Sequence, residues 1–81
     1  MNEKALKWAC RRGMLELDIL LNQFLSEGYA HLSEPQKLTF VELLKTEDAE
    51  LFAWLMGKVE PCDENLLKMI GLVRQNVVKL R

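Results

Sequence analysis

One segment of this 81-residue chain gathers charged and aromatic side chains around a glycine. Residues 8–18 read WACRRGMLELD and contain one tryptophan, two adjacent arginines and two acids. Arg12 and Glu16 flank Gly13 and are four positions apart, so they can touch if the turn is tight. Arginine and tryptophan are over-represented at the energetic hot spots of protein interfaces. One interpretation is that Gly13 lets another protein's backbone approach while Arg12 and Glu16 hydrogen-bond across the contact.

A purely structural interpretation of the same segment is equally available. Arg11 and Arg12 would then neutralise the negative C-terminal end of the preceding helix, and Glu16 the positive N-terminal end of the next one. Gly13 would only supply the bend between them. The residue types by themselves do not decide between the two interpretations.

Signatures of catalysis are absent elsewhere in the chain. The four glycines are scattered and form no phosphate-binding loop. Cys10 and Cys62 form no C-x-x-C pair, and His31 has no neighbouring cysteine or serine, so we expect neither a zinc site nor a catalytic pair. A bundle of this size should also have little room for a pocket of about 300 Å³. We therefore expect no catalytic residue, no bound metal and no enzyme activity.

The net charge of −1 hides a basic, an acidic and a second basic stretch. Residues 1–15 carry a net charge of +3, residues 16–64 carry −8, and residues 65–81 carry +4. The acidic centre would repel phosphate, so we expect no nucleic-acid partner. No apolar stretch approaches the roughly 18 residues that span a bilayer, so we expect no membrane insertion. With no apolar targeting segment at the N-terminus and only two cysteines, both read as reduced thiols, we expect a cytoplasmic protein.

Length and composition predict an all-α fold, a compact bundle of five short helices in a single domain of residues 1–81. Leucine dominates the apolar residues and no useful segment alternates with period two, which favours helices over strands. The expected helices span about residues 3–11, 14–27 and 34–45, then a stretch between Thr46 and Gly57, and finally a stretch that begins at Pro61 and Asp63.

Capping residues mark where several of these helices begin or end. Ser33 and Gln36 can form a capping box, with Pro35 in the first turn. Thr46 can cap the fourth helix, and Gly28 stands where the second should end.

The apolar periodicity predicts which side chains enter the core. The first helix should bury the side that holds Leu6, Trp8, Ala9 and Cys10. The third should bury either Leu38, Val41 and Leu44 or their neighbours Phe40 and Leu43. The last helix carries an apolar seam that packs against the others, with steps of four and three residues, formed by Leu66, Ile70, Val73, Val77 and Leu80.

Residues 8–18 closely resemble the R-G-x-x-E signature of the succinate dehydrogenase FAD-assembly factor family. Residues 47–55, EDAELFAWL, look like that family's acidic D-x-x-L-[FY]-x-W-L segment, with Ala49 where many relatives have proline. Asp48 and Trp54 match this second segment, and we expect Trp54 to lie mainly in the core. The resemblance covers nearly the whole chain, including its length and the order of its helices.

The resemblance implies a small five-helix protein that promotes covalent attachment of FAD to the flavoprotein subunit of succinate dehydrogenase, and often of fumarate reductase. In such proteins the R-G-x-x-E loop faces the partner near its flavin site, so Arg12, Gly13 and Glu16 inherit that role. Three adjoining family positions, which should border or support the contact, are held by Trp8, Arg11 and Asp18.

The implied mechanism needs no catalytic residue in this chain. The flavin and the partner's own nucleophile can perform the chemistry while a small protein holds the geometry. We therefore expect a monomer that binds no FAD stably and handles FAD only through the partner. The alternative is an antitoxin-type interaction protein of a toxin–antitoxin pair, because members of this family have also been described in that way.

Overall fold

The computed structural model describes residues 2–79, and for residues 77–79 it describes the backbone only. This part of the chain contains α-helices, one short 3-10 helix and no strand, which confirms the all-α prediction. In order along the chain the elements are α1 (Glu3–Ala9), α2 (Leu15–Glu27), η1 (Tyr29–His31), α3 (Glu34–Leu43), α4 (Asp48–Leu55) and α5 (Glu64–Lys79). The first helix ends two residues earlier than predicted, at Ala9. The extent of the domain, residues 1–81, stays a prediction.

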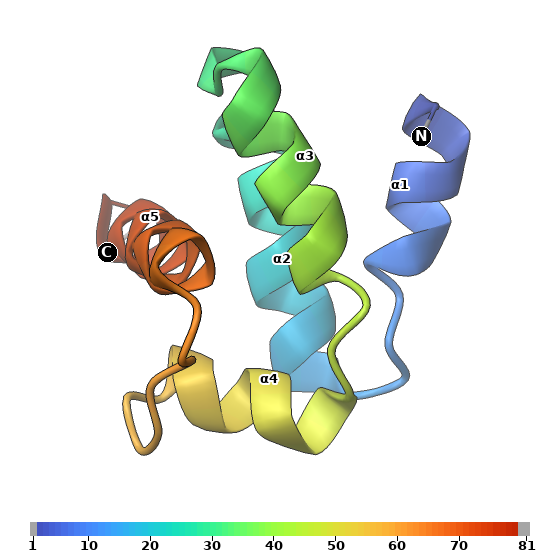
Figure 1. Cartoon of the computed structure of the whole chain (residues 1–81). Coiled ribbons are helices and arrows are strands. Elements are labelled where there is room, and N and C mark those ends of the chain that lie inside the picture. Colours follow the sequence, from blue (N-terminus) through green and yellow to red (C-terminus); the bar gives the residue numbers. More distant parts are fainter. Residues whose placement is uncertain (1, 80–81) are drawn as a thin grey trace.

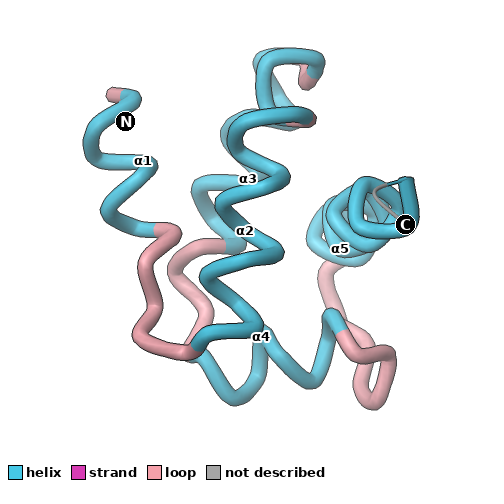
Figure 2. Tube along the Cα trace, turned by 180° about the vertical axis from the view of Figure 1, so that it is seen from behind, coloured by secondary structure: helices cyan, strands magenta, loops and turns pink. Residues whose placement is uncertain are grey.

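Helices α2 and α3 stand side by side at the centre of the molecule (Figure 1). Helix α1 flanks them on one side, α5 packs against both of them on the other, and α4 crosses beneath their ends. Figure 2 shows the same arrangement from behind, with the α1–α2 connection close to the start of α4. The radius of gyration is 11.5 Å, close to the roughly 12 Å expected for a compact domain of this length. The predicted compact bundle is confirmed.

The core is apolar throughout the described chain. Phe40 of α3 is at its centre, with its ring 5.3 Å from that of Phe24 and 5.6 Å from that of Tyr29, measured between centroids. Trp54 is only 8% exposed, as predicted. No described polar or charged residue is buried. The buried apolar residues are Leu6, Cys10, Leu17, Leu21, Phe24, Phe40, Leu43, Leu44, Leu51, Trp54, Leu55, Met69, Ile70 and Val73.

Two apolar residues that the sequence makes candidates for the core lie outside it. Trp8 is predicted to be buried, and Leu38 belongs to one of the two alternatives for the third helix. Trp8 is 73% exposed, because the seven-residue α1 buries only the side that carries Leu6 and Cys10.

Leu38 is 69% exposed, whereas Phe40 and Leu43 are buried, so the alternative with Phe40 and Leu43 is confirmed for α3. Of the other alternative only Leu38 is wrong, since Leu44, the C-cap of α3, is buried and Val41 is partly buried. The aromatic contacts of Phe40 set the rotation of α3, and a residue two positions away, about 200° around the helix, must then face outward.

The apolar seam of α5 is confirmed as far as the side chains are described. Ile70 and Val73 are buried, and Leu66 packs against the core while remaining partly exposed. The side chain of Val77 and residue Leu80 lie outside the described part of the chain.

The helix caps follow the sequence with one exception. Ser33 and Gln36 form the predicted capping box, with Pro35 in the first turn of α3, and Gly28 is the C-cap of α2. The predicted N-cap of α4 at Thr46 is wrong, because Glu47 takes that position without a side-chain hydrogen bond. The backbone carbonyl of Thr46 instead accepts a hydrogen bond from the side chain of Arg12, so a residue far away in the sequence holds this stretch in place.

Candidate functional site

The signature residues lie in and around the α1–α2 connection, residues 10–14. Cys10 is the C-cap of α1 and Met14 is the N-cap of α2. Between them Gly13 has a φ angle of +78°, a left-handed conformation that glycine adopts without strain. The space beside it is open, since a Cβ atom at Gly13 would have no neighbour within 4 Å. The backbone N–H of Arg12 donates to Oδ1 of Asp18 at 2.5 Å, which holds the connection against the first turn of α2.

The side chain of Arg12 turns inward and joins three parts of the fold. Its Nε donates to Oδ1 of Asp48 at 2.7 Å, at the start of α4. Its Nη1 donates to the carbonyls of Leu44 at 2.5 Å and of Ala9 at 3.3 Å, and its Nη2 to the carbonyl of Thr46. The side chain of Arg12 is only 13% exposed, so most of its donors are occupied inside the protein.

The predicted proximity of Arg12 and Glu16 does not occur. Arg12 forms its ion pair with Asp48, and Glu16 lies exposed on α2. The carbonyls that follow α3 carry the negative end of that helix's dipole, so they attract the guanidinium inward. The hydrogen bond from Arg12 to the carbonyl of Ala9 agrees with the structural interpretation, in which an arginine neutralises the end of α1.

The other signature residues face solvent. Gly13 and Glu16 are exposed, and Trp8 is 73% exposed on the outer side of α1. The guanidinium carbon of Arg11 lies 5.9 Å from the centroid of the Trp8 ring, so the two side chains form one cation–π pair. Consecutive arginines therefore have opposite environments: Arg11 is available to a partner, whereas Arg12 braces the fold.

Sequence reasoning missed two exposed apolar residues next to this surface. Leu15 is 69% exposed and Ile19 is 48% exposed, one turn apart on α2. The signal was present, because Leu17 and Leu21 face the core and residues two positions from them must face away. They add exposed apolar area on α2 to the area that Trp8 supplies on α1.

Both described cysteines are free thiols with contrasting surroundings. Cys62 is exposed, whereas Cys10 is completely buried beneath the α1–α2 connection. Burial raises the pKa of Cys10 from 9.0 to about 11, with Arg12 lowering it and Asp18 raising it to a smaller extent. Cys10 is therefore protonated and unreactive at neutral pH.

The surface has more room for a ligand than the sequence predicted. A groove of about 910 Å³ separates α1 from α2, η1 and α3, so the expectation of little pocket space is wrong. It arises because α1 packs on the bundle mainly through Leu6 and Cys10 and leaves its flank open. Its lining residues are Glu3, Leu6, Lys7, Arg11, Asn22, Leu25, Ser26, Tyr29, Ala30 and Lys37.

The described residues offer neither a metal site nor a membrane-spanning helix. They contain no cluster of three or more histidine, cysteine or acidic side chains that could hold a metal ion. None of their helices has the length and apolarity needed to cross a membrane.

Residues 4–77 match the model of a protein family described as "Flavinator of succinate dehydrogenase". The chain is 46% identical over 76 residues to the FAD assembly factor SdhE of Idiomarina loihiensis, covering 94% of this chain and 84% of that protein. It is 49% identical over 74 residues to the SdhE of Shewanella oneidensis, covering 91% and 90%. It is 48% identical over 77 residues to the SdhE of Colwellia psychrerythraea, covering 95% and 85%.

Proposed function

The chain belongs to the family of flavinators of succinate dehydrogenase, and from this we propose that it binds the flavoprotein subunit of that enzyme and promotes covalent attachment of FAD to it. The names of the similar proteins, FAD assembly factors, support this proposal. The flavoprotein subunit of fumarate reductase is a second client that we propose. The antitoxin alternative finds no support in these comparisons.

The observation that carries the proposal is that some residues at the α1–α2 connection hold its shape from inside while others are exposed to solvent. Arg12 and Asp18 hold the connection from inside, through the guanidinium network and the 2.5 Å bond to the backbone N–H of Arg12. Gly13 is thereby presented to solvent on a loop whose shape is already determined, and Glu16 is presented from the first turn of α2. A preformed and exposed loop suits docking, because little conformational entropy is lost on binding.

This chain's contribution to the reaction is positioning. FAD and the client's own nucleophile supply the chemistry of attachment. Gly13 leaves room for the client's backbone, and Glu16 is free to accept hydrogen bonds from it, while Trp8 and Arg11 border the contact. Holding a mobile client in the arrangement that favours attachment accelerates the reaction without a catalytic residue here. We propose that the chain acts in the cytoplasm as a monomer and retains no FAD of its own.

Co-expression with the flavoprotein subunit tests the proposal. Covalent flavin on the client is read as fluorescence of its band in a denaturing gel. Gly13→Arg should reduce that fluorescence to the level seen without this chain, because the added side chain blocks docking. Gly71→Arg is the matched control, since Gly71 is also exposed with no atom within 4 Å of an added Cβ.

The two variants separate docking from folding. Gly71→Arg should support normal covalent flavin, and thermal unfolding should show that both variants remain folded. A client that carries full covalent flavin without this chain would contradict the proposal. Normal flavin with Gly13→Arg would remove the assigned role of the α1–α2 connection.

A further inference from the structure

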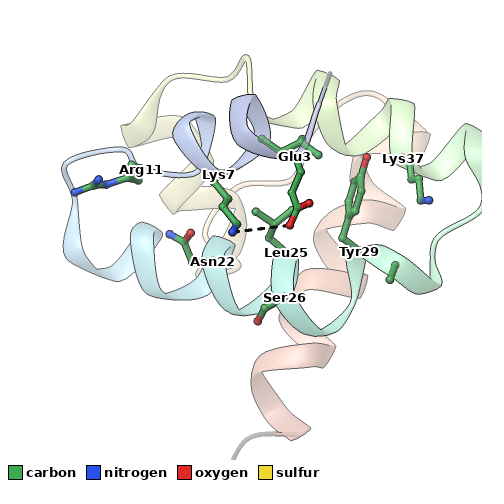
Figure 3. Close-up of a pocket in the computed structure, with 10 residues that line it drawn as sticks. Glu3, Lys7, Arg11, Asn22, Leu25, Ser26, Tyr29 and Lys37 are labelled. Carbon is green, nitrogen blue, oxygen red and sulfur yellow. Dashed lines mark ion pairs between the residues drawn. The ribbon is translucent and has the colours of Figure 1, made fainter.

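The charged side chains of the groove between α1 and the rest of the bundle are mostly basic (Figure 3). Lys7, Arg11 and Lys37 line it, against one acid, Glu3. In Figure 3, Arg11 lies toward one end, Lys37 toward the other and Lys7 between them. The charged side chains of the groove therefore sum to +2, although six of its ten lining residues belong to the central stretch, residues 16–64, with a net charge of −8.

The positive charges of the groove are only weakly neutralised within the protein. The Nζ atom of Lys7 lies 3.8 Å from a carboxylate oxygen of Glu3, and both side chains are largely exposed. Lys37 lies equally far from Glu34, whose side chain points into solvent. The side chain of Lys37 is 30% exposed, whereas both glutamates are more than 80% exposed. Pairs with such exposed glutamates contribute little, so an incoming carboxylate can replace either glutamate at small cost.

The floor of the groove is apolar. Leu6 is buried and Leu25 is half-buried, and together they leave a hydrophobic surface between the helices. Tyr29 is held at the end of this floor by its ring contact with Phe40, and Nζ of Lys37 lies 5.4 Å from the Tyr29 centroid. These residues offer an aromatic and aliphatic seat for one apolar side chain.

The neutral polar residues of the groove already have partners. Asn22 donates to the carbonyl of Asp18, and Ser26 donates to the carbonyl of Gln23. They are therefore less available for reading a ligand, and the groove selects by positive charge and apolar contact. Its α2 wall, from Asn22 to the end of the helix, is roughly 8–10 Å long, which accommodates about three residues of extended chain.

We propose that this groove binds a short acidic segment of the flavoprotein client, with one apolar side chain on Leu25 and Tyr29 and flanking carboxylates on Lys7 and Lys37. Charge complementarity supports this occupant, and Arg11 connects the groove directly to the α1–α2 connection. The inference rests on the proposed function and adds a second contact surface to it. A client held at two surfaces is oriented as well as bound.

Charge reversal with a matched control tests this surface. Lys7→Glu combined with Lys37→Glu should weaken binding to the purified flavoprotein subunit about tenfold or more and flatten its dependence on salt. Lys45→Glu combined with Lys68→Glu is the control. Lys45 and Lys68 pair with Glu42 and Glu64 at the same sequence spacings, 3.0 and 3.7 Å apart, outside the groove. The control should change affinity less than about threefold.

Lysine acetylation of the unmutated chain supplies a measurement that does not depend on the variants. Lys7 and Lys68 are similarly exposed, 67% and 72% for their side chains. Adding the flavoprotein subunit should protect Lys7 and Lys37 from acetylation and leave Lys68 reactive. Circular dichroism checks that both double variants remain folded.

The outcomes separate this inference from the proposed function. If both double variants bind the flavoprotein subunit equally well, and Lys7 and Lys37 are not protected, the proposed binding of an acidic segment in the groove is wrong. The proposed function still stands in that case if binding depends on Gly13. If sodium pyrophosphate at micromolar concentration protects both lysines, the groove binds a small anion, and the proposal that it binds an acidic segment is wrong. If the unmutated chain does not bind the flavoprotein subunit, both proposals fail.

Discussion

Two connections of this molecule share a backbone feature and differ in what holds them. The α1–α2 connection, residues 10–14, contains Gly13 with a φ angle of +78°. The α4–α5 connection, residues 56–63, contains Gly57 with a φ angle of +76°. Each also contains one cysteine, Cys10 in the first and Cys62 in the second.

The α4–α5 connection is held locally. The N–H of Lys58 donates to the carbonyl of Ala53, and the N–H of Gly57 to that of Trp54, which together form a Schellman motif at the end of α4. The α1–α2 connection instead depends on Arg12, whose partners Leu44, Thr46 and Asp48 lie more than 30 positions away. Gly57 therefore closes a helix, whereas Gly13 belongs to a loop that only the assembled fold can shape.

The largest expected effect comes from removing the long-range brace. Arg12→Ala should lower the free energy of unfolding by roughly 2–4 kcal/mol, because it leaves Asp48 and three carbonyls without their largely buried partner. Urea denaturation measures the loss. Arg11→Ala is the control, since removing this exposed side chain should lower the free energy of unfolding by less than about 0.5 kcal/mol. Equal stability of the two variants would contradict the assignment of Arg12 as a brace.

The cysteines of the two connections should differ in their effect on stability at high pH. Because the pKa of Cys10 is raised from 9.0 to about 11 in the folded state, the unfolded chain loses this proton first as pH rises. Stability should therefore fall between pH 9 and pH 11, by roughly 2–3 kcal/mol from this thiol. Thermal unfolding across this range should show a smaller decline for Cys10→Ala than for the unmutated chain. Cys62→Ala should decline like the unmutated chain, and a matching decline in Cys10→Ala would rule out the thiol as its cause.

The two glycines should show the smallest change in stability and the clearest division of function. Gly13→Ala and Gly57→Ala should each cost about 1–2 kcal/mol, because alanine is strained at a positive φ angle. Co-expression with the flavoprotein subunit then distinguishes them. Gly57→Ala should retain covalent flavin on the client, while larger residues at position 13 should progressively reduce it. Loss of flavin with folded Gly57→Ala would extend the contact to the α4–α5 connection.

Features governed by neighbouring residues were predictable from the sequence. The capping box at Ser33 and Gln36 and the C-cap at Gly28 depend on side chains within a few positions. The apolar periodicity of α5 correctly placed Ile70 and Val73 in the core. Thr46 shows the limit of such local reasoning, because its carbonyl is engaged by a residue 34 positions away.

The candidate site was located by residue type but not resolved in detail. The R-G-x-x-E pattern identified the correct family, and the membership of the chain in it is established. The pattern could not distinguish Arg11 from Arg12, which have the same chemistry and adjacent positions. Nor could it indicate the groove beside α1, since this depends on how closely a short helix packs against its neighbours.

The sequence by itself determined the helical class, most helix ends and the family, because periodicity, caps and motifs are local properties of the chain. Only the tertiary structure decided which signature residues face solvent. Arg12 becomes a brace because the ends of α3 and α4 bring acceptors around it. Gly13, Glu16, Trp8 and Arg11 are exposed because no element packs over them. Burial and long-range hydrogen bonding arise from the packing of distant segments, and local sequence does not encode them.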